Sequence, residues 1–374
     1  MKKMTIILMI LSSLVLTGCW DMLDVNNRIY PYSVGFDLDE NSEEMYKISY
    51  SYPNIFALGK NPTSEEKAFV VSVNGNNIFQ AMHHLTTRIS FPMYLKHLKV
   101  VVFSEDVLND SDLVKEIVDG VNRDFIANKN TQLLLAKDGS EALLQGTIKS
   151  TEQQIVGGTI YNLLLNQQES SLFTPNTMGN LVEDMDDSGA SIIPVGFIMD
   201  GELHIEGGAV IKDYKMVGYL APKENRAIAH LNNDVATDGI DVDYKGHNLS
   251  LMISESKTKK KLISKDENIK IRLDLAMEGH IHSYTLKEEA NVNTQQDNKD
   301  MEREAAKVVE KEMNQAVNKI QKDLKADVLF IGDYLSKFHP KLWREIEKDW
   351  DELYPDIEIE VNVTVKIRRR GLTK

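Results

Sequence analysis

The feature that most constrains this chain is a stretch of 13 mostly apolar residues that leads into its only cysteine. The stretch covers residues 4–16, follows two lysines and is interrupted only by one threonine and two serines. It has the length of the apolar part of a secretion signal and is shorter than the ~20 residues that span a bilayer. A lone cysteine also excludes intramolecular disulfides and thiolate zinc clusters. The remaining chain must therefore fold around a hydrophobic core without either kind of cross-link.

The residues around the cysteine have the form of a bacterial lipobox. Leu16-Thr17-Gly18-Cys19 supplies a branched apolar residue, two small residues and a thiol at the end of the apolar stretch. Small residues let a signal peptidase grip the backbone, and the thiol is the nucleophile that forms a thioether to diacylglycerol. We therefore predict that residues 1–18 are a lipoprotein signal peptide and that Cys19 is lipidated, with a thioether and an N-acyl chain. The alternative is a buried structural cysteine behind an ordinary signal, which the position of the thiol disfavours.

Composition indicates a folded, multidomain body. The chain has 374 residues, 42% hydrophobic and 27% charged, with only 9 prolines, which is typical of globular proteins. The formal charge of −14 argues against a nucleic-acid binder, because such proteins carry a basic face. No other segment reaches ~18 consecutive apolar residues. We expect a water-soluble body tethered by Cys19 to the outer face of the membrane, with an acidity that disfavours lying flat on anionic lipid.

Hydrophobic periodicity predicts strands that alternate with helices in the first half. Strands are expected around 28–38, 45–52, 68–73, 97–103 and 131–136, and helices around 78–89 and 111–128. Beyond Pro194 the pattern changes to short strands separated by turns, and then to alternating strands over 241–288. The basic run at 257–261 is expected at a hairpin tip.

The C-terminal part contains the longest predicted helix, at 298–326. Its apolar residues recur every three or four positions: Met301, Ala305, Val309, Met313, Val317, Ile320 and Leu324. We expect this face to pack across a sheet of the same domain, the alternative being a coiled-coil seam. A second helix is expected through Leu335 and Trp350, and a strictly alternating strand at 357–367. The helical spacing also places Trp343 and Trp350 in a core, whereas Trp20 beside the lipid suits the headgroup zone.

These patterns predict an α+β fold of several domains, with small mixed sheets packed by helices and a long amphipathic helix in the C-terminal domain. The expected borders are 20–195 for an N-terminal α/β-type domain and 196–374 for a C-terminal α+β domain. A further division near 262 is left open.

No residue pattern in the chain demands catalysis or a metal. Glu278, His280 and His282 alternate on one strand face, but a zinc site also needs supporting groups, so we interpret this face as solvated. The acidic residues from Asp37 to Glu43 begin like a calcium loop but lack its glycine and its final carboxylate. A Gly-x-Ser-x-Gly elbow is absent, and lipidation uses the cysteine. We predict no catalytic residue, no cofactor and no metal ligand.

The opening Cys19-Trp20-Asp21, followed by Val34-Gly35-Phe36-Asp37, resembles the Ger(x)C family, the lipoprotein C subunits of the nutrient germinant receptors of bacterial endospores. The resemblance covers nearly the whole chain in order. It continues through Arg123-Asp124, Gly207-Gly208-Ala209, Ala326-Asp327, Phe330-Ile331-Gly332, His339-Pro340-Lys341-Leu342-Trp343, and Trp350. The sequence departs from the family at Asp24, often glutamate, and at Ser283, often acidic.

The resemblance implies a non-enzymatic subunit on the outer face of the inner spore membrane. Its implied partners are two integral membrane subunits, one with a large soluble domain and one similar to an amino-acid transporter. Their joint response to nutrients would trigger the release of ions and dipicolinate. Small-molecule binding by this subunit is not expected. Two alternatives remain: a lipoprotein that captures a nutrient in a deep interdomain pocket, and an extracellular hydrolase with a cleft of perturbed carboxylates.

Overall fold

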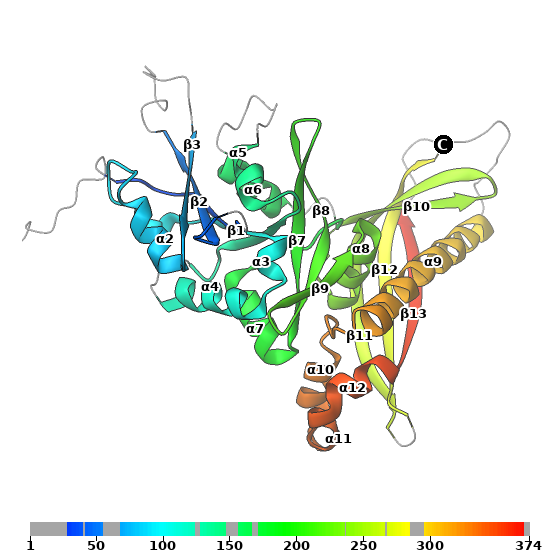
Figure 1. Cartoon of the computed structure of the whole chain (residues 1–374). Helices are drawn as coiled ribbons and strands as arrows, with labels where there is room; N and C mark the ends of the chain where they lie inside the picture. Colours follow the sequence, from blue (N-terminus) through cyan, green and yellow to red (C-terminus); the bar gives the residue numbers. More distant parts are fainter. Residues whose placement is uncertain are drawn as a thin grey trace, which may run out of the picture.

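The computed structural model describes residues 28–39, 42–54, 68–123, 128–146, 156–166, 171–235, 237–265, 268–284 and 295–369. The signal peptide, Cys19 and Trp20 lie outside these residues. Within them the chain forms two sheets, one of nine strands and one of four (Figure 1). None of the described helices is both long and apolar enough to cross a membrane.

The nine-stranded sheet has the order β3-β2-β1-β4-β5-β7-β8-β9, with the short β6 paired to β5. Its strands are β1 (Ser33–Leu38), β2 (Tyr46–Pro53), β3 (Ala68–Gly75), β4 (Val100–Ser104), β5 (Gln132–Ala136), β6 (Asn176–Thr177), β7 (Ala190–Met199), β8 (Glu202–Lys212) and β9 (Lys215–Leu220). The central strands β1, β4, β5 and β7 are parallel, and antiparallel strands extend both sides. β4 and β5 are buried along their whole length, as expected for apolar strands covered on both faces.

Helices cover both faces of this sheet. One face carries α2 (Ile78–Leu85), α3 (Glu105–Leu108), α4 (Ser111–Arg123) and α7 (Met178–Asp187), and the other carries α5 (Ser140–Gln145) and α6 (Val156–Leu165). A short 3₁₀ turn, Leu95–His97, precedes β4. Because side chains alternate along a strand, the neighbours Val101 and Val102 enter opposite cores.

The motif Val34-Gly35-Phe36-Asp37 seats α5 against β1. A Cβ at Gly35 would lie 2.3 Å from Oγ of Ser140, so only glycine allows this approach. The carboxylate of Asp37 accepts hydrogen bonds from the backbone nitrogens of Ser140 (2.7 Å) and Glu141 (3.0 Å) and from the Ser140 hydroxyl (2.6 Å). The N–H groups at the start of a helix have no partners within the helix, and Asp37 accepts hydrogen bonds from them at the start of α5. Its role is therefore structural.

The four-stranded sheet has the order β10-β11-β12-β13, with β13 parallel to β12. Its strands are β10 (Asp238–Tyr244), β11 (His247–Ser264), β12 (Lys270–Tyr284) and β13 (Glu358–Arg369). The basic run at 257–261 lies inside β11, so its expected position at a hairpin tip was wrong. The paired strands continue past it because the lysines alternate between faces and Lys261 pairs with Asp274 on β12.

The long helix α9 (Gln295–Asn318) continues as a π-helical turn, Lys319–Asp323, and lies across the inner face of this sheet. The predicted apolar stripe from Met301 to Ile320 is buried in the core that also contains β10–β13. This confirms packing within the domain, because the stripe is already covered and no apolar seam remains for a coiled coil.

Helix α8 (Pro222–Asn232) lies between the two sheets (Figure 1). It contacts β8 and β9 on one side and β11 and β12 on the other. Val210 and Leu220 of the nine-stranded sheet belong to the same core cluster as α8 and the four-stranded sheet. The joint between the two parts is therefore a packed core, and the first sheet continues past position 195 through β7, β8 and β9.

Three short helices close the C-terminal part: α10 (Ile331–Phe338), α11 (Pro340–Ile346) and α12 (Trp350–Leu353), with 3₁₀ turns at Glu347–Asp349 and Tyr354–Asp356. The rings of Trp343 and Trp350 meet edge to face at 5.4 Å and pack on the core, as predicted. The α+β class, the mixed sheets and the long C-terminal helix are confirmed. The first sheet, at nine strands, is larger than the small sheets expected, because strands distant in sequence join one continuous array.

Candidate functional site

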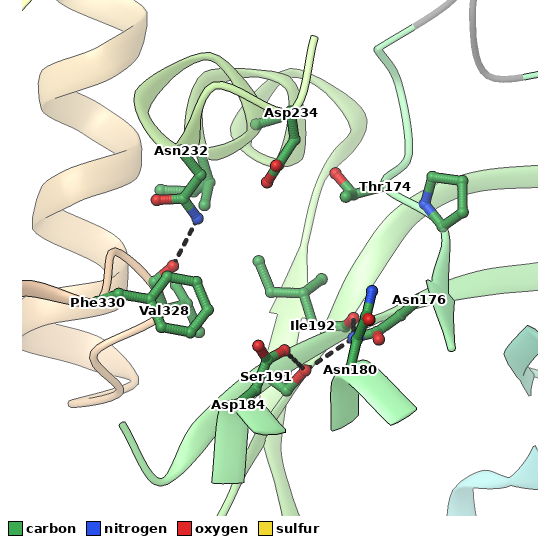
Figure 2. A pocket seen from close by; sticks show the side chains of 13 residues that line it. Thr174, Asn176, Asn180, Asp184, Ser191, Ile192, Asn232, Asp234, Val328 and Phe330 are labelled. Atoms are coloured by element: carbon green, nitrogen blue, oxygen red, sulfur yellow. Dashed lines mark hydrogen bonds between the residues drawn. The ribbon is translucent and has the colours of Figure 1, made fainter. Parts of the chain in front are cut away.

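A pocket of about 300 Å³ lies at the joint between the two sheets (Figure 2). One wall comes from residues 174–176, α7 and β7 of the nine-stranded part. The other comes from the end of α8 and the segment 328–330 that precedes α10. The second wall combines α8, which contacts both sheets, with a segment of the C-terminal part, so a molecule in this pocket would contact both halves of the protein.

The floor of the pocket is a chain of three polar side chains. Ser191 Oγ on β7 donates a hydrogen bond of 2.5 Å to Asp184 Oδ2 on α7. The amide nitrogen of Asn176 donates to Ser191 Oγ and to the carbonyl oxygen of Ile192, both at 2.7 Å. Burial raises the pKa of the Asp184 carboxyl to about 6, against the opposing effect of the hydrogen bond from Ser191. The hydroxyl of Ser191 and the amide of Asn176 therefore donate to acceptors within the protein.

The opposite wall carries a second carboxylate, Asp234, just beyond α8 (Figure 2). Burial of this group against the wall raises its pKa to about 6, and the negative charge of Asp184 contributes in the same direction. Nearby, the amide nitrogen of Asn232 donates to the carbonyl oxygen of Val328 at 2.8 Å. Two carboxylates from different halves of the protein therefore share one pocket and interact electrostatically.

The remaining lining is apolar and carries no positive charge. Ile192, Ile228, Val328 and Phe330 supply the hydrocarbon surface, and no lysine, arginine or histidine is among the lining residues. Lys260 on β11 lies close enough to lower the pKa of Asp234, but its ammonium donates to the carbonyl oxygen of Leu329. The pocket presents hydrogen-bond acceptors and negative charge, and the Ser191 hydroxyl in its floor donates to the Asp184 carboxylate.

A second concave region, of about 460 Å³, lies at the carboxyl ends of β1, β4 and β5. Three of its acidic side chains make contacts within the fold. Asp37 caps α5, Glu141 forms an ion pair with Lys47 and accepts from Ser72 Oγ at 2.6 Å, and Glu105 accepts from the Tyr219 hydroxyl at 2.6 Å.

A Ser-His-Asp arrangement that sequence reasoning missed lies under α8. The imidazole of His230 has Nδ1 at 2.8 Å from Ser256 Oγ and Nε2 at 2.9 Å from Asp238 Oδ2. The imidazole is 1% exposed, and neither pocket includes any of the three residues. A catalytic serine needs room for substrate at its hydroxyl. The arrangement instead connects α8 to β10 and β11, and no local sequence signal joins residues this far apart in the chain.

Of the three strand residues singled out in the sequence, Glu278, His280 and His282, the first has a structural partner. Two guanidinium nitrogens of Arg368 on β13, Nη2 and Nε, donate to Glu278 at 2.5 and 2.7 Å. Among the described residues, no group of three histidine, cysteine or acidic side chains is placed to hold a metal ion. Cys19, the predicted lipidation residue, lies outside the described ranges.

Both parts of the chain match families of spore germination proteins. Residues 21–196 match the family described as "Spore germination protein N-terminal domain", and residues 206–371 match "Spore germination B3/ GerAC like, C-terminal". The two matches together cover most of the chain and carry the Ger(x)C resemblance. The chain belongs to the Ger(x)C family.

Individual relatives match over nearly their whole length. Spore germination protein B3 of Bacillus subtilis (strain 168) is 22% identical over 367 residues, which is 96% of this chain and 95% of the relative. Spore germination protein A3 of the same organism is 25% identical over 373 residues, covering 99% and 98%. The crystal structure of the GerBC protein has the same fold, with a TM-score of 0.62 and 19% identity over 93% of this chain and 100% of that one.

Proposed function

We propose that this protein is the lipid-anchored, non-enzymatic C subunit of a spore germinant receptor and is needed for nutrient-triggered germination. The observation that carries the proposal is the family match across both parts of the chain, with relatives of nearly the same length. The proposal extends the names of the relatives, which concern spore germination, to this chain.

The partners we propose are two integral membrane subunits, reached by a body held at the outer face of the inner spore membrane. The signal-like residues 1–18 and Cys19 support this placement. Two acyl chains hold far more firmly than one, since each buried methylene contributes about 0.8 kcal/mol. A tether also raises the local concentration of the body near its partners, so contacts of low intrinsic affinity suffice.

A non-enzymatic role is supported by the structural contacts that potentially reactive side chains make. The buried His230 is hydrogen-bonded to Ser256 and Asp238, and Asp37, Glu105 and Glu141 at the ends of β1, β4 and β5 make structural contacts. These groups hold elements together, and His230, Ser256 and Asp238 line neither pocket. We propose that the protein acts by contact with its partners.

The test is dipicolinate release from spores of a deletion strain exposed to single nutrients. We expect loss of the response to one nutrient class, with normal release by a trigger that bypasses nutrient receptors. The strain is complemented with the wild-type gene and with Cys19→Ala, and immunoblots of membrane fractions measure amount and anchoring. Full release across the panel, or full release by an unanchored Cys19→Ala protein, would contradict the receptor role or the role of the anchor, respectively.

A second candidate function is direct capture of a solute, which the pocket between the two halves favours. It is a pocket with convergent polar groups between two packed units, a common location for ligand sites.

A further inference from the structure

The chain that leaves Cys19 enters the described structure at Arg28, nine positions later. A chain of this length spans about 30 Å at most, even when it is fully extended. The backbone nitrogen of Tyr94 donates to the carbonyl oxygen of Ile29 at 2.8 Å, so residues 92–99 lie directly beside this entry point. An anchor at Cys19 therefore keeps this part of the surface close to the membrane.

Rings and cations gather at the entry point. The guanidinium carbon of Arg28 lies 4.8 Å from the centre of the Tyr94 ring, and the ammonium of Lys96 lies 5.9 Å from the same centre. The rings of Tyr30 and His97 pack against Tyr94, with centroid distances of 5.8 and 5.5 Å. Tyrosine favours the headgroup level of a bilayer, and lysine and arginine are attracted to anionic lipid. The cluster thus combines the two kinds of side chain that suit a membrane surface.

More cations lie at the same edge, because the parallel strands β1, β4 and β5 begin there side by side. Lys99 directly precedes β4, and Lys129 is exposed three residues before β5. We define the entry edge as residues 28–32, 92–99 and 128–131, and these residues include no aspartate or glutamate. The opposite ends of the same strands are acidic, since the concave region there is lined by six acidic residues and two lysines. The nine-stranded part therefore has a basic end and an acidic end.

We propose that the entry edge docks on anionic lipid headgroups of the membrane that holds the anchor, so that the body stands end-on. This inference rests on the proposed anchoring through Cys19. The two ends are about 15 Å apart, because β4 spans five residues at ~3.3 Å each, whereas charges are screened within about 8–10 Å in physiological salt. The membrane therefore attracts the basic end and scarcely repels the acidic one. Docking in this way agrees with the overall negative charge, which disfavours only a flat orientation.

The anchor and the entry edge have complementary roles. A few cations bind a membrane only weakly on their own, and the tether supplies the high local concentration that makes such binding effective. The tether alone leaves the body free to rotate, whereas contact along the entry edge fixes its direction. Docking would thus hold the acidic end of β1, β4 and β5 away from the lipid.

The test couples the chain from Cys19 to Lys374 through its only cysteine to a maleimide lipid in vesicles. Docking is then measured whatever modification Cys19 carries in the cell. Hydrogen exchange, read by mass spectrometry, compares vesicles of phosphatidylcholine with vesicles that also contain phosphatidylglycerol. On the anionic vesicles at about 0.1 M salt, we expect slower exchange at residues 92–99 and 128–131, unchanged exchange at residues 247–264, and loss of the protection at about 1 M salt. Equal exchange on the two kinds of vesicle, or equal protection over the whole chain, would overturn the proposal.

Charge-reversed variants locate the contact. Lys96→Glu combined with Lys129→Glu should weaken docking at least about tenfold and remove the protection. The matched control combines Lys257→Glu with Lys259→Glu, which changes the net charge equally at exposed positions of β11. Equal losses in the two double variants would show attraction without a defined face and would overturn the proposal.

The wild-type comparison on the two kinds of vesicle decides the proposal even where a variant does not fold. Its failure is also distinct from failure of the proposed function. Full germination by spores with an unanchored Cys19→Ala protein would contradict the role of the anchor, whereas absent protection on anionic vesicles would contradict only the docking.

Discussion

The indole of Trp350 donates a hydrogen bond from Nε1 to Oδ2 of Asp327 at 3.2 Å, inside the C-terminal core. The same carboxylate accepts from the backbone nitrogens of Ile331 (2.9 Å) and Gly332 (2.7 Å), so it caps the start of α10. Burial raises the pKa of Asp327, and these hydrogen bonds oppose the shift. Four of the segments that carry the family resemblance meet here. These four segments therefore form one set of structural contacts, which holds α10, α11 and α12 against α9 and the four-stranded sheet.

Removing the carboxylate of Asp327 should destabilise the protein strongly. Asp327→Ala leaves two backbone N–H groups and the indole N–H of Trp350 buried without their acceptor, and we expect a loss of about 2–4 kcal/mol of unfolding free energy. Urea denaturation followed by tryptophan fluorescence measures it. The control Asp349→Ala, at an exposed neighbouring position, should change stability by less than about 0.5 kcal/mol. Similar losses in both variants would contradict the capping role.

Gly332 is required because the tryptophans pack against its backbone. A Cβ at this position would lie 2.9 Å from both the Trp343 ring and Trp350 Nε1. We expect Gly332→Ala to lose about 1–3 kcal/mol through overpacking. Gly120→Ala is the matched control, since nothing lies within 4 Å of its Cβ position and alanine favours the helix by about 0.5–1 kcal/mol. Thermal melts that show stabilisation at both positions would refute this packing argument.

The buried histidine network should matter for stability and not for catalysis. His230→Ala leaves Asp238 and Ser256 without their ring partners, and we expect a loss of about 2–4 kcal/mol. Ser256→Ala removes one hydrogen bond of a half-buried hydroxyl and should lose only about 1 kcal/mol. Spores carrying Ser256→Ala should release dipicolinate at the wild-type rate in response to nutrient. Abolished release with normal protein levels would instead support a catalytic serine.

The pocket carboxylates make stability depend on pH. The pKa of Asp184 is about 6 in the folded protein and ~3.9 in an unfolded chain, so between these values the folded state holds a proton that the unfolded state releases. The contribution of Asp184 is therefore fully present below about pH 4 and is lost as the pH rises through about 6. The pKa values of Asp184 and Asp234 are also influenced by the charges of Glu183, Asp187 and Lys260.

Asp184→Asn should therefore be more stable than the wild type at about pH 8, by about 1–2 kcal/mol after allowance for partial solvent screening. The two proteins should converge near pH 4, where the wild-type carboxyl is protonated. Denaturation at a series of pH values measures the difference. A gap that is constant with pH would show that the substitution acts through packing and not through ionisation.

Several parts of the architecture were predictable from local patterns. The spacing of Met301, Ala305 and Val309 predicted which face of α9 is buried, because a helix repeats every 3.6 residues whatever surrounds it. Strict alternation predicted β13, and helical spacing predicted that Trp343 and Trp350 belong to the core. The basic run in β11 led to a wrong prediction of a hairpin tip, because charged residues also occur on exposed strand faces. Local composition does not distinguish an exposed strand face from a turn.

The sequence by itself predicted an export signal and a lipidation motif, and it determined the membership of the family and the buried faces of the main helices and strands. Each of these depends on residues that are neighbours in the chain. Only the tertiary structure decided that β7–β9 extend the first sheet, that Ser256, His230 and Asp238 meet, and that Asp184 faces Asp234 across a pocket. The reason is that strand pairing and domain packing bring together residues separated by tens of positions, and hydrophobic periodicity carries no information about which distant surfaces meet.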